Sequence, residues 1–296
     1  MTVDLAVATP TFLDLTFVGL EALPAPGQET FAADLVRSPG GGAITAVGAA
    51  RLGLSVALAA PLGEDDAGDF VRAALHGEGV ATSDRRSPRT PTTVVLPVDG
   101  DRAMVTVDPG VRASAADVAG LEPRAVALSL DQLYGVPAGA AAYVTCGDDD
   151  SRAFARRPPA KLAIARALFV SEREALTLTE ESDVEAAAQV LGKSAERVIV
   201  TLGAAGAISL VEGRTMRAPA IETTALDTTG AGDLLVAAYI WADLRGLSPE
   251  ECLTWAVLYA GLSITKPTGV GGAVSESRLL DEGAQRGLTA PRSATA

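Results

Sequence analysis

The chain of 296 residues is long enough for one large α/β domain or two smaller domains. Apolar residues make up 48% of it and charged residues 21%, which excludes disorder except at the ends. Its 24 basic and 37 acidic residues give a formal net charge of −13, so the surface repels nucleic-acid phosphates and anionic lipids. We therefore expect no nucleic-acid partner, no membrane partner and a cytoplasmic location, because no apolar run approaches the ~18 residues that span a bilayer.

Residues that form metal sites and disulfides are scarce in this chain. It contains one histidine, His76, and two cysteines, Cys146 and Cys252, which lie far apart in the sequence. This excludes a His-rich metal site and favours two buried thiols over a disulfide framework or a zinc site.

Short apolar runs of strand length recur along the chain, and several are separated by stretches of helix length. These runs lie at residues 5–8, 56–60, 125–130, 142–145, 167–170 and 198–202. The alternation predicts an α/β fold with a parallel sheet and helices on both of its faces.

Residues 12–36 and 92–107 depart from this alternation. The second stretch contains Asp99-Gly100, a dipeptide typical of a tight hairpin turn, between two β-favouring runs. The first combines short β-favouring runs with Pro24 and Pro26, a poor composition for a crossover helix. We expect the two stretches to pair as a small sheet. Periodicity alone does not decide whether this sheet closes over a ligand or is an edge extension or dimer surface.

These patterns divide the chain into three parts. The small sheet is predicted as a β lid, and an edge strand of such a lid would also allow two chains to pair as a homodimer. The predicted main domain comprises residues 1–11, 37–91 and 108–282, the lid comprises 12–36 and 92–107, and residues 283–296 form a flexible tail.

The segment DTTGAGD at residues 227–233 directly precedes a helical apolar pattern over 232–244. Its glycines predict a tight turn whose free backbone N–H groups point out of the helix N-terminus and bind an anion. Asp233 falls in the first helical turn, where a carboxylate is placed to take a proton from a hydroxyl that attacks a bound phosphoryl group. The alternative is an acidic residue that merely stabilises the helix N-terminus.

This segment resembles the second signature, DTxGAGD, of the ribokinase-like carbohydrate kinases (the PfkB family), and it matches at all seven positions. Three further stretches agree with that family in content and order. They are Asp14 with the turn 40–42, the stretch from Arg51-Leu52-Gly53 to residue 65, and residues 200–206. The resemblance implies a three-layer αβα body with a small β-sheet lid.

The resemblance also implies a function. The chain would transfer the γ-phosphoryl group of ATP, with Mg²⁺, to a hydroxyl of a sugar, a sugar acid or a related small molecule. Its partners would then be ATP and that acceptor. The alternatives are a nucleoside kinase, a non-catalytic nucleotide- or ligand-binding member of the same fold, and a different reaction on the same scaffold.

The site residues implied by the resemblance fall into four groups. The catalytic group is Asp233 as general base with Gly230, Ala231 and Gly232 as the anion hole, and the substrate group is Asp14, Gly40, Gly41, Gly42 and Thr45. The nucleotide group is Ser171, Thr201, Gly203, Gly206 and Val257. The metal group is Glu174, which would hold Mg²⁺ through water, with Asp227 and Thr229 for a monovalent cation such as K⁺.

Three positions depart from the family pattern. Ile44 stands where most relatives place a substrate-binding asparagine, Ser171 stands where an asparagine precedes the acidic residue, and Val257 replaces a polar residue near the adenine. These departures leave open which acceptor is phosphorylated and, to a lesser degree, how fast the reaction is and which nucleotide is used. Asp148-Asp149-Asp150 is predicted to be a solvated loop, because three consecutive carboxylates in one extended stretch cannot converge on one ion.

Overall fold

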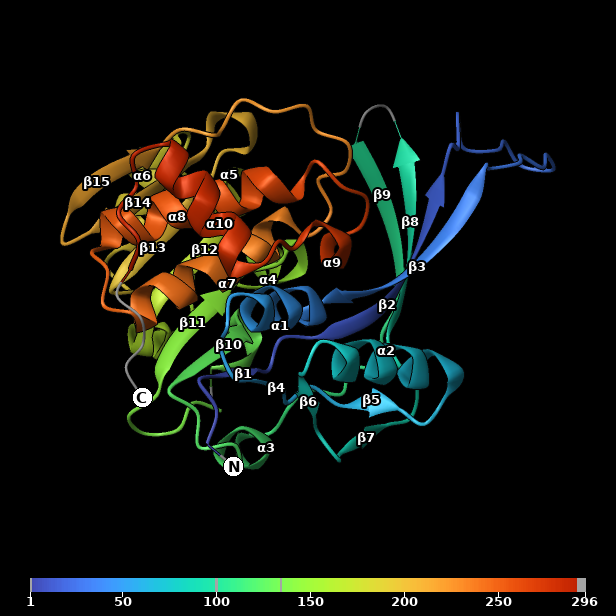
Figure 1. The fold of residues 1–296 in the computed structure, drawn as a ribbon, viewed down its shortest axis with the longest axis horizontal. Helices are drawn as coiled ribbons and strands as arrows, with labels where there is room; N and C mark the ends of the chain where they lie inside the picture. The colour runs from blue at the N-terminus through green and yellow to red at the C-terminus, as the bar shows by residue number, and fades with distance from the viewer. Residues whose placement is uncertain (1, 99–100, 134, 292–296) are drawn as a thin grey trace.

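A central sheet and two helical layers build the main body of the molecule (Figure 1). The computed structural model describes residues 2–98, 101–133 and 135–291. In this part of the chain the central sheet has nine strands in the order β15-β14-β13-β12-β11-β10-β1-β4-β6, and only β14 runs opposite to the others, antiparallel to both of its neighbours. Its strands are β1 (Leu5–Val7), β4 (Val56–Leu58), β6 (Ala81–Thr82), β10 (Ala125–Ser129), β11 (Ala141–Thr145), β12 (Ala165–Ser171), β13 (Arg197–Thr201), β14 (Ala207–Val211) and β15 (Arg214–Ala218).

The sheet is buried on both faces because its strands carry apolar side chains at consecutive positions. Leu5 and Val7 join one core cluster, whereas Ala6 and Ala8 join the other. The first cluster includes side chains of α1 (Gly42–Arg51), α2 (Asp66–Gly77), α7 (Ala231–Leu244), α8 (Pro249–Ser263) and α10 (Glu276–Gln285). The second includes side chains of α3 (Ala115–Ala119), α5 (Glu172–Thr179), α6 (Val184–Leu191), η1 (Leu130–Gln132) and η2 (Ala160–Ile164). The predicted three-layer αβα body is confirmed.

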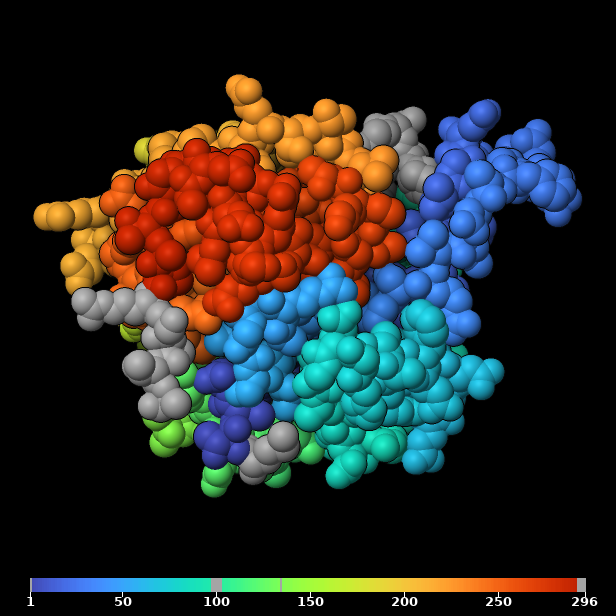
Figure 2. All heavy atoms as spheres, in the orientation of Figure 1, coloured from blue at the N-terminus to red at the C-terminus, as the bar shows by residue number. Residues whose placement is uncertain are grey.

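The two β-rich stretches pair in one four-stranded sheet, as predicted. Its order is β3-β2-β8-β9, with β2 parallel to β8 and antiparallel to β3. This sheet projects from the body, and its β2–β3 end extends farthest into solvent (Figures 1 and 2). Its strands are β2 (Thr11–Val18), β3 (Asp34–Gly41), β8 (Thr92–Val98) and β9 (Asp101–Val107). The predicted turn at Asp99-Gly100 lies outside the described residues.

The remaining short elements connect these layers. β5 (Leu62–Gly63) and β7 (Arg86–Ser87) form a separate two-stranded sheet. The other short helices are α4 (Asp148–Ala153), α9 (Gly269–Gly272) and η3 (Gly203–Ala205). Within the described residues, no helix is long and apolar enough to cross a membrane. Both cysteines are buried and unpaired, as predicted.

Three boundaries differ from the sequence prediction. The first stretch of the small sheet begins at Thr11 and ends at Gly41, so it extends past the predicted range 12–36 at both ends. The predicted flexible tail begins too early, because α10 continues to Gln285 and Gly283 is buried beneath the ring of Trp255. Residues 292–296 of that tail lie outside the described residues.

The predicted acidic loop after β11 is also wrong, because Asp148, Asp149 and Asp150 form the first turn of α4. A helix is favoured there because carboxylates stabilise a helix N-terminus. In addition, the Asp150 carboxylate accepts the N–H of Gly147 at 3.5 Å, and Arg152 forms ion pairs with Asp148 and Asp149.

Candidate active site

The DTTGAGD segment forms a tight turn into α7. Gly230 is the residue that caps the helix, with a φ of 76°, and no side chain caps the helix there. Within the described chain the N–H groups of Gly230 and Gly232 make no hydrogen bond, whereas that of Ala231 donates to the Thr228 carbonyl oxygen at 3.3 Å. The turn therefore keeps two of the three predicted amides available to an anion.

Asp227, the first residue of the segment, ties this turn to a second loop. One of its carboxylate oxygens accepts the N–H of Thr229 and the other accepts the N–H of Thr268, both at 2.8 Å. Thr268 caps α9, whose first residue, Gly269, packs against the turn at Gly230. The loop 268–272 thus lies directly beside the turn into α7.

Asp233 lies in the first turn of α7, as the helical pattern predicts. The Thr45 hydroxyl oxygen lies 3.4 Å from Asp233 Oδ1 and 3.4 Å from the Asp233 carbonyl oxygen. Thr45 itself is 1% exposed. Thr45, predicted to contact the substrate, therefore contacts the predicted base, which lies 188 positions away in the sequence. Its side chain does not reach an open surface.

The other predicted substrate residues meet where β2, β3 and α1 come together. Asp14 is buried on β2, and its carboxylate covers Gly40 so closely that a Cβ there would lie 2.1 Å from Asp14 Oδ2. Gly41 caps α1 and Gly42 begins it. A Cβ on Gly42 would lie 2.6 Å from the Thr9 hydroxyl oxygen. Close approach of side chains and backbone explains why this turn consists of glycines.

Ile44, in the position of the family's asparagine, does not face an open pocket. Its side chain is 2% exposed and packs against Gly230 and Gly269. A Cβ on Gly269 would lie 2.4 Å from Ile44 Cδ1. The residue therefore supports the predicted anion-binding turn from below, a contact that the sequence did not reveal.

The predicted nucleotide residues gather at the ends of β12 and β13. Ser171 and Thr201 are register partners there, and both are partly exposed. Gly203 begins the turn η3, with open space on the side where a Cβ would project, and its carbonyl oxygen accepts the Gly206 N–H at 3.0 Å. Val257 is different, because it lies on α8 with its side chain buried in the core. Its contact with a nucleotide stays a prediction.

Glu174, the predicted Mg²⁺ residue, forms a capping box with Ser171. Its Oε2 atom accepts the Ser171 N–H at 2.7 Å, and the Ser171 hydroxyl accepts the Glu174 N–H at 3.2 Å. The pKa of Glu174 is raised by burial and by the nearby charge of Asp148, although hydrogen bonds from the Ser171 backbone and side chain to the carboxylate partly oppose this. A nearby cation would stabilise the ionised form of such a carboxylate.

The donor set fits Mg²⁺ held mainly by phosphate oxygens and water. Among the described residues, no group of three or more histidine, cysteine, aspartate or glutamate side chains is arranged to hold a metal ion. Mg²⁺ commonly keeps several waters and uses one or two carboxylates together with substrate phosphates. Glu174 satisfies that requirement. A K⁺ site at Asp227 and Thr229 stays a prediction.

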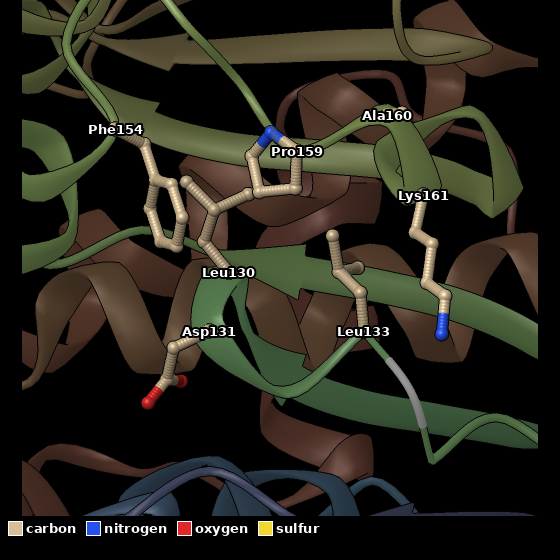
Figure 3. A pocket seen from close by; sticks show the side chains of 7 residues that line it. All are labelled: Leu130, Asp131, Leu133, Phe154, Pro159, Ala160 and Lys161. Carbon is tan, nitrogen blue, oxygen red and sulfur yellow. The ribbon is translucent and has the colours of Figure 1, made fainter.

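A cavity of about 230 Å³ lies away from these residues. In Figure 3 the apolar side chains of Leu130, Phe154 and Pro159 lie next to one another, and the charged end of Lys161 points away from them. None of the predicted catalytic, substrate or nucleotide residues lines this cavity. The candidate site is therefore defined by the convergence of the turn 227–233, α1 and the small sheet.

An αβα body with a projecting β-sheet, and a glycine turn next to a carboxylate, is the arrangement expected of an α/β small-molecule kinase. The model of the pfkB family carbohydrate kinases matches residues 16–120 and 138–274. The chain belongs to this family.

Relatives and solved structures agree with this assignment. A ribokinase of Haemophilus influenzae is 28% identical over 251 residues, which cover 77% of this chain and 81% of the relative. A 1-phosphofructokinase of Haloferax volcanii is 35% identical over 94 residues, so the match spans about a third of each chain: 32% of this one and 30% of the relative. The structure of an Arabidopsis thaliana ribokinase complexed with ribose and ATP has the same fold, with a TM-score of 0.78, 24% identity and coverage of 95% and 99% of the two chains.

Proposed function

We propose that this protein transfers the γ-phosphoryl group of ATP to a hydroxyl group of a sugar, a sugar acid or a related small molecule. One observation carries the proposal: Asp233 lies in the first turn of α7, directly after a turn in which the Gly230 and Gly232 amides make no hydrogen bond in the described chain. An anion site and a carboxylate are thereby adjacent. Phosphoryl transfer needs this combination.

In the proposed reaction, Asp233 takes the proton of the acceptor hydroxyl as its oxygen bonds to the γ-phosphorus. The bond from that phosphorus to the bridging oxygen of ADP breaks, and ADP leaves with the electron pair. The amides of Gly230 and Gly232 stabilise the negative charge on the transferring group. Glu174 would hold Mg²⁺ through water, and the ion would supply positive charge next to the phosphates.

Residues of the small sheet and of α1 would hold the acceptor. Asp14 carries the carboxylate suited to sugar hydroxyls, and the glycines 40–42 give the acceptor access to the backbone. Ser171, Thr201 and the turn at Gly203 would bind the nucleotide at the other end of the site. The names of the relatives, ribokinase and 1-phosphofructokinase, support a sugar or sugar phosphate as the acceptor.

The test is ADP release from ATP and Mg²⁺ with a panel of sugars, keto-deoxy acids, phosphosugars and nucleosides. Asp233→Asn should reduce turnover by on the order of 10²-fold or more while ATP binding is retained. Asp281→Asn is the matched control, because Asp281 is an exposed aspartate on α10. Unchanged turnover in Asp233→Asn would exclude Asp233 as the base.

A second candidate function is a non-catalytic ligand-binding protein. Ile44 favours it, because this buried apolar side chain cannot donate a hydrogen bond to a sugar oxygen. Thermal stabilisation by ATP or an acceptor, with no ADP release across the whole panel, would support this alternative. A cytoplasmic location is part of either proposal.

Pairing of two chains through the small sheet is part of the proposal. β9 is an edge strand, and Val105 and Val107 on it are 62% and 52% exposed. The strand register puts them on the same face as Leu35, which is opposite to the face of Asp14. A second copy of the chain would cover this apolar face. A monomeric mass by light scattering at micromolar concentration would exclude the dimer.

A further inference from the structure

We propose that Thr45 is a positioning residue for Asp233. Its hydroxyl group holds the Asp233 carboxylate in the ionised form and in the orientation that accepts the acceptor's proton. This inference rests on the proposed kinase function, in which Asp233 is the base. It assigns to Thr45 a role that differs from the direct substrate contact predicted from the sequence.

The contact is enclosed and specific. The Thr45 hydroxyl oxygen lies 3.4 Å from Asp233 Oδ1 and 3.4 Å from the Asp233 carbonyl oxygen. Its hydroxyl has one proton, so it donates to one of these two acceptors at a time. Since Thr45 is 1% exposed, water does not readily replace it as a donor at this point. The hydroxyl is thus placed to respond to the charge of the carboxylate.

The packing of α1 against α7 fixes this contact. A Cβ on Gly48 would lie 2.5 Å from Leu234 Cδ2 and 3.1 Å from the Ala237 Cβ, so the two helices approach closely at Gly48. Thr45 precedes Gly48 by one turn of α1, and Asp233 precedes Leu234 on α7. Residues three apart on a helix share a face, so the close approach at Gly48 brings Thr45 to Asp233.

The chemistry of proton transfer gives this contact a function. Donation to an ionised carboxylate stabilises the charged form, which keeps Asp233 able to accept a proton. After Asp233 takes the proton, rotation of the Thr45 hydroxyl redirects its own proton to the Asp233 carbonyl oxygen. The geometry thus supplies the stabilising donor only when the base is charged.

Other charged groups near this end of α7 stay constant when Thr45 is replaced. α9, which packs against the turn, consists of residues 269–272 and carries no titratable side chain. The charged groups on the neighbouring elements include Asp14 on β2, Asp34 and Arg37 on β3, Arg51 at the far end of α1 with its partner Glu78, Asp227 in the turn and Lys266 before α9. A difference between Thr45 variants therefore reports on the hydroxyl group.

The experiment compares Thr45→Val, which keeps the branched shape and removes the hydroxyl, with Thr45→Ser, which keeps the hydroxyl. Thr254→Val is the control, because it removes a helical hydroxyl that donates to the Glu250 carbonyl oxygen far from Asp233 in the sequence. Two kinds of measurement are made: steady-state kinetics give kcat and the KM values for ATP and acceptor, and carbon-13 NMR titration gives the Asp233 pKa. Asp233→Asn assigns the Asp233 signal.

We expect Thr45→Val to lower kcat about tenfold with KM for ATP unchanged, and to raise the Asp233 pKa by about half a unit to one unit. Thr45→Ser should restore most of both quantities, and Thr254→Val should resemble the wild type. A wild-type kcat and Asp233 pKa in Thr45→Val would overturn the inference. If Thr45→Val unfolds, Thr45→Ala and Thr45→Ser provide the same comparison.

The NMR measurement separates this inference from the proposed function. If wild-type protein releases no ADP with any acceptor, the kinase proposal fails. The Asp233 pKa of the Thr45 variants still decides whether the hydroxyl stabilises the carboxylate. An unshifted pKa in all variants would reject the positioning role, whatever the activity of the protein.

Discussion

Ile44 and Gly230 are in direct contact across the interface of α1 with the turn before α7. A Cβ added to Gly230 would lie 2.8 Å from Ile44 Cδ1 and 2.8 Å from the Gly269 Cα. Gly230 also has a φ of 76°, a backbone conformation that is unfavourable for residues with a Cβ. Steric space and backbone conformation therefore both require glycine at this position.

Gly230→Ala should consequently lose stability and ADP release together. Gly246→Ala is a matched control, because Gly246 has a φ of 75° and open space around the position of its missing Cβ. The control should lose about 1 kcal/mol from backbone strain alone. Gly230→Ala should lose about 1–3 kcal/mol more from the clash. Chemical denaturation measures both, and equal losses in the two variants would contradict the steric argument.

The fold was predictable because the strands carry a simple signal. The run 125–130, for example, is apolar at four consecutive residues, 125–128, as is typical of a strand buried on both faces, and residues 125–129 form β10. The turn into α7 was predictable for a similar local reason, since glycines and an acidic residue before an apolar helix define its N-terminus.

Contacts between distant segments could not be predicted in this way. The meeting of Thr45 with Asp233 depends on how closely α1 packs against α7, which no local pattern encodes. Likewise, Gly283 suggested a flexible end, but its missing side chain makes room for Trp255, since a Cβ there would lie 2.1 Å from Trp255 Cη2. The composition of a segment does not show which distant side chain packs against it.

Asp227→Asn should weaken the connection between the two loops of the site. The carboxylate accepts one amide hydrogen on each oxygen, whereas an asparagine offers one acceptor and turns an NH₂ group toward the other amide. A loss of about 1–3 kcal/mol is expected, with ADP release reduced because the turn at Gly230 is no longer fixed. Differential scanning fluorimetry measures the stability. A melting temperature equal to that of the exposed control Asp281→Asn would contradict this role.

Asp243, at the C-terminal end of α7, holds the helix to the sheet through buried charges. Its carboxylate accepts hydrogen bonds from the Tyr143 hydroxyl at 2.5 Å, Arg166 Nε at 2.6 Å and Arg197 Nη1 at 2.8 Å. Burial alone would raise the pKa of Asp243, but these three donors hold it below its usual range. Arg197 is itself only 6% exposed, and Asp243 is its buried counter-charge, since its other partner, Glu196, lies 3.5 Å away with a side chain that is 54% exposed.

Asp243→Asn should therefore destabilise the protein by about 3–5 kcal/mol, because it leaves buried arginine charge uncompensated. Glu185→Gln is the control. It breaks the ion pair between Glu185 and Arg217, and both of these side chains are more than half exposed. Such exposed pairs contribute about 0–1 kcal/mol to the free energy of unfolding. Urea denaturation of both variants gives the comparison. Similar losses in the two would show that the buried cluster contributes no more than a surface pair.

Asp150 should make stability depend on pH. Burial and the nearby charge of Asp131 raise the pKa of Asp150 to about 6, above its usual value. Between about pH 4 and pH 6 the folded protein then keeps a proton that the unfolded chain has lost, so stability falls as the pH rises through this window. Asp150→Asn removes this loss and should melt about 1–3 °C above the wild type at about pH 7.5, with a smaller difference at about pH 5. Asp281→Asn, at an exposed position on α10, is the control. A difference between Asp150→Asn and wild type that stays constant over this range would show that the charge of Asp150 is not the cause.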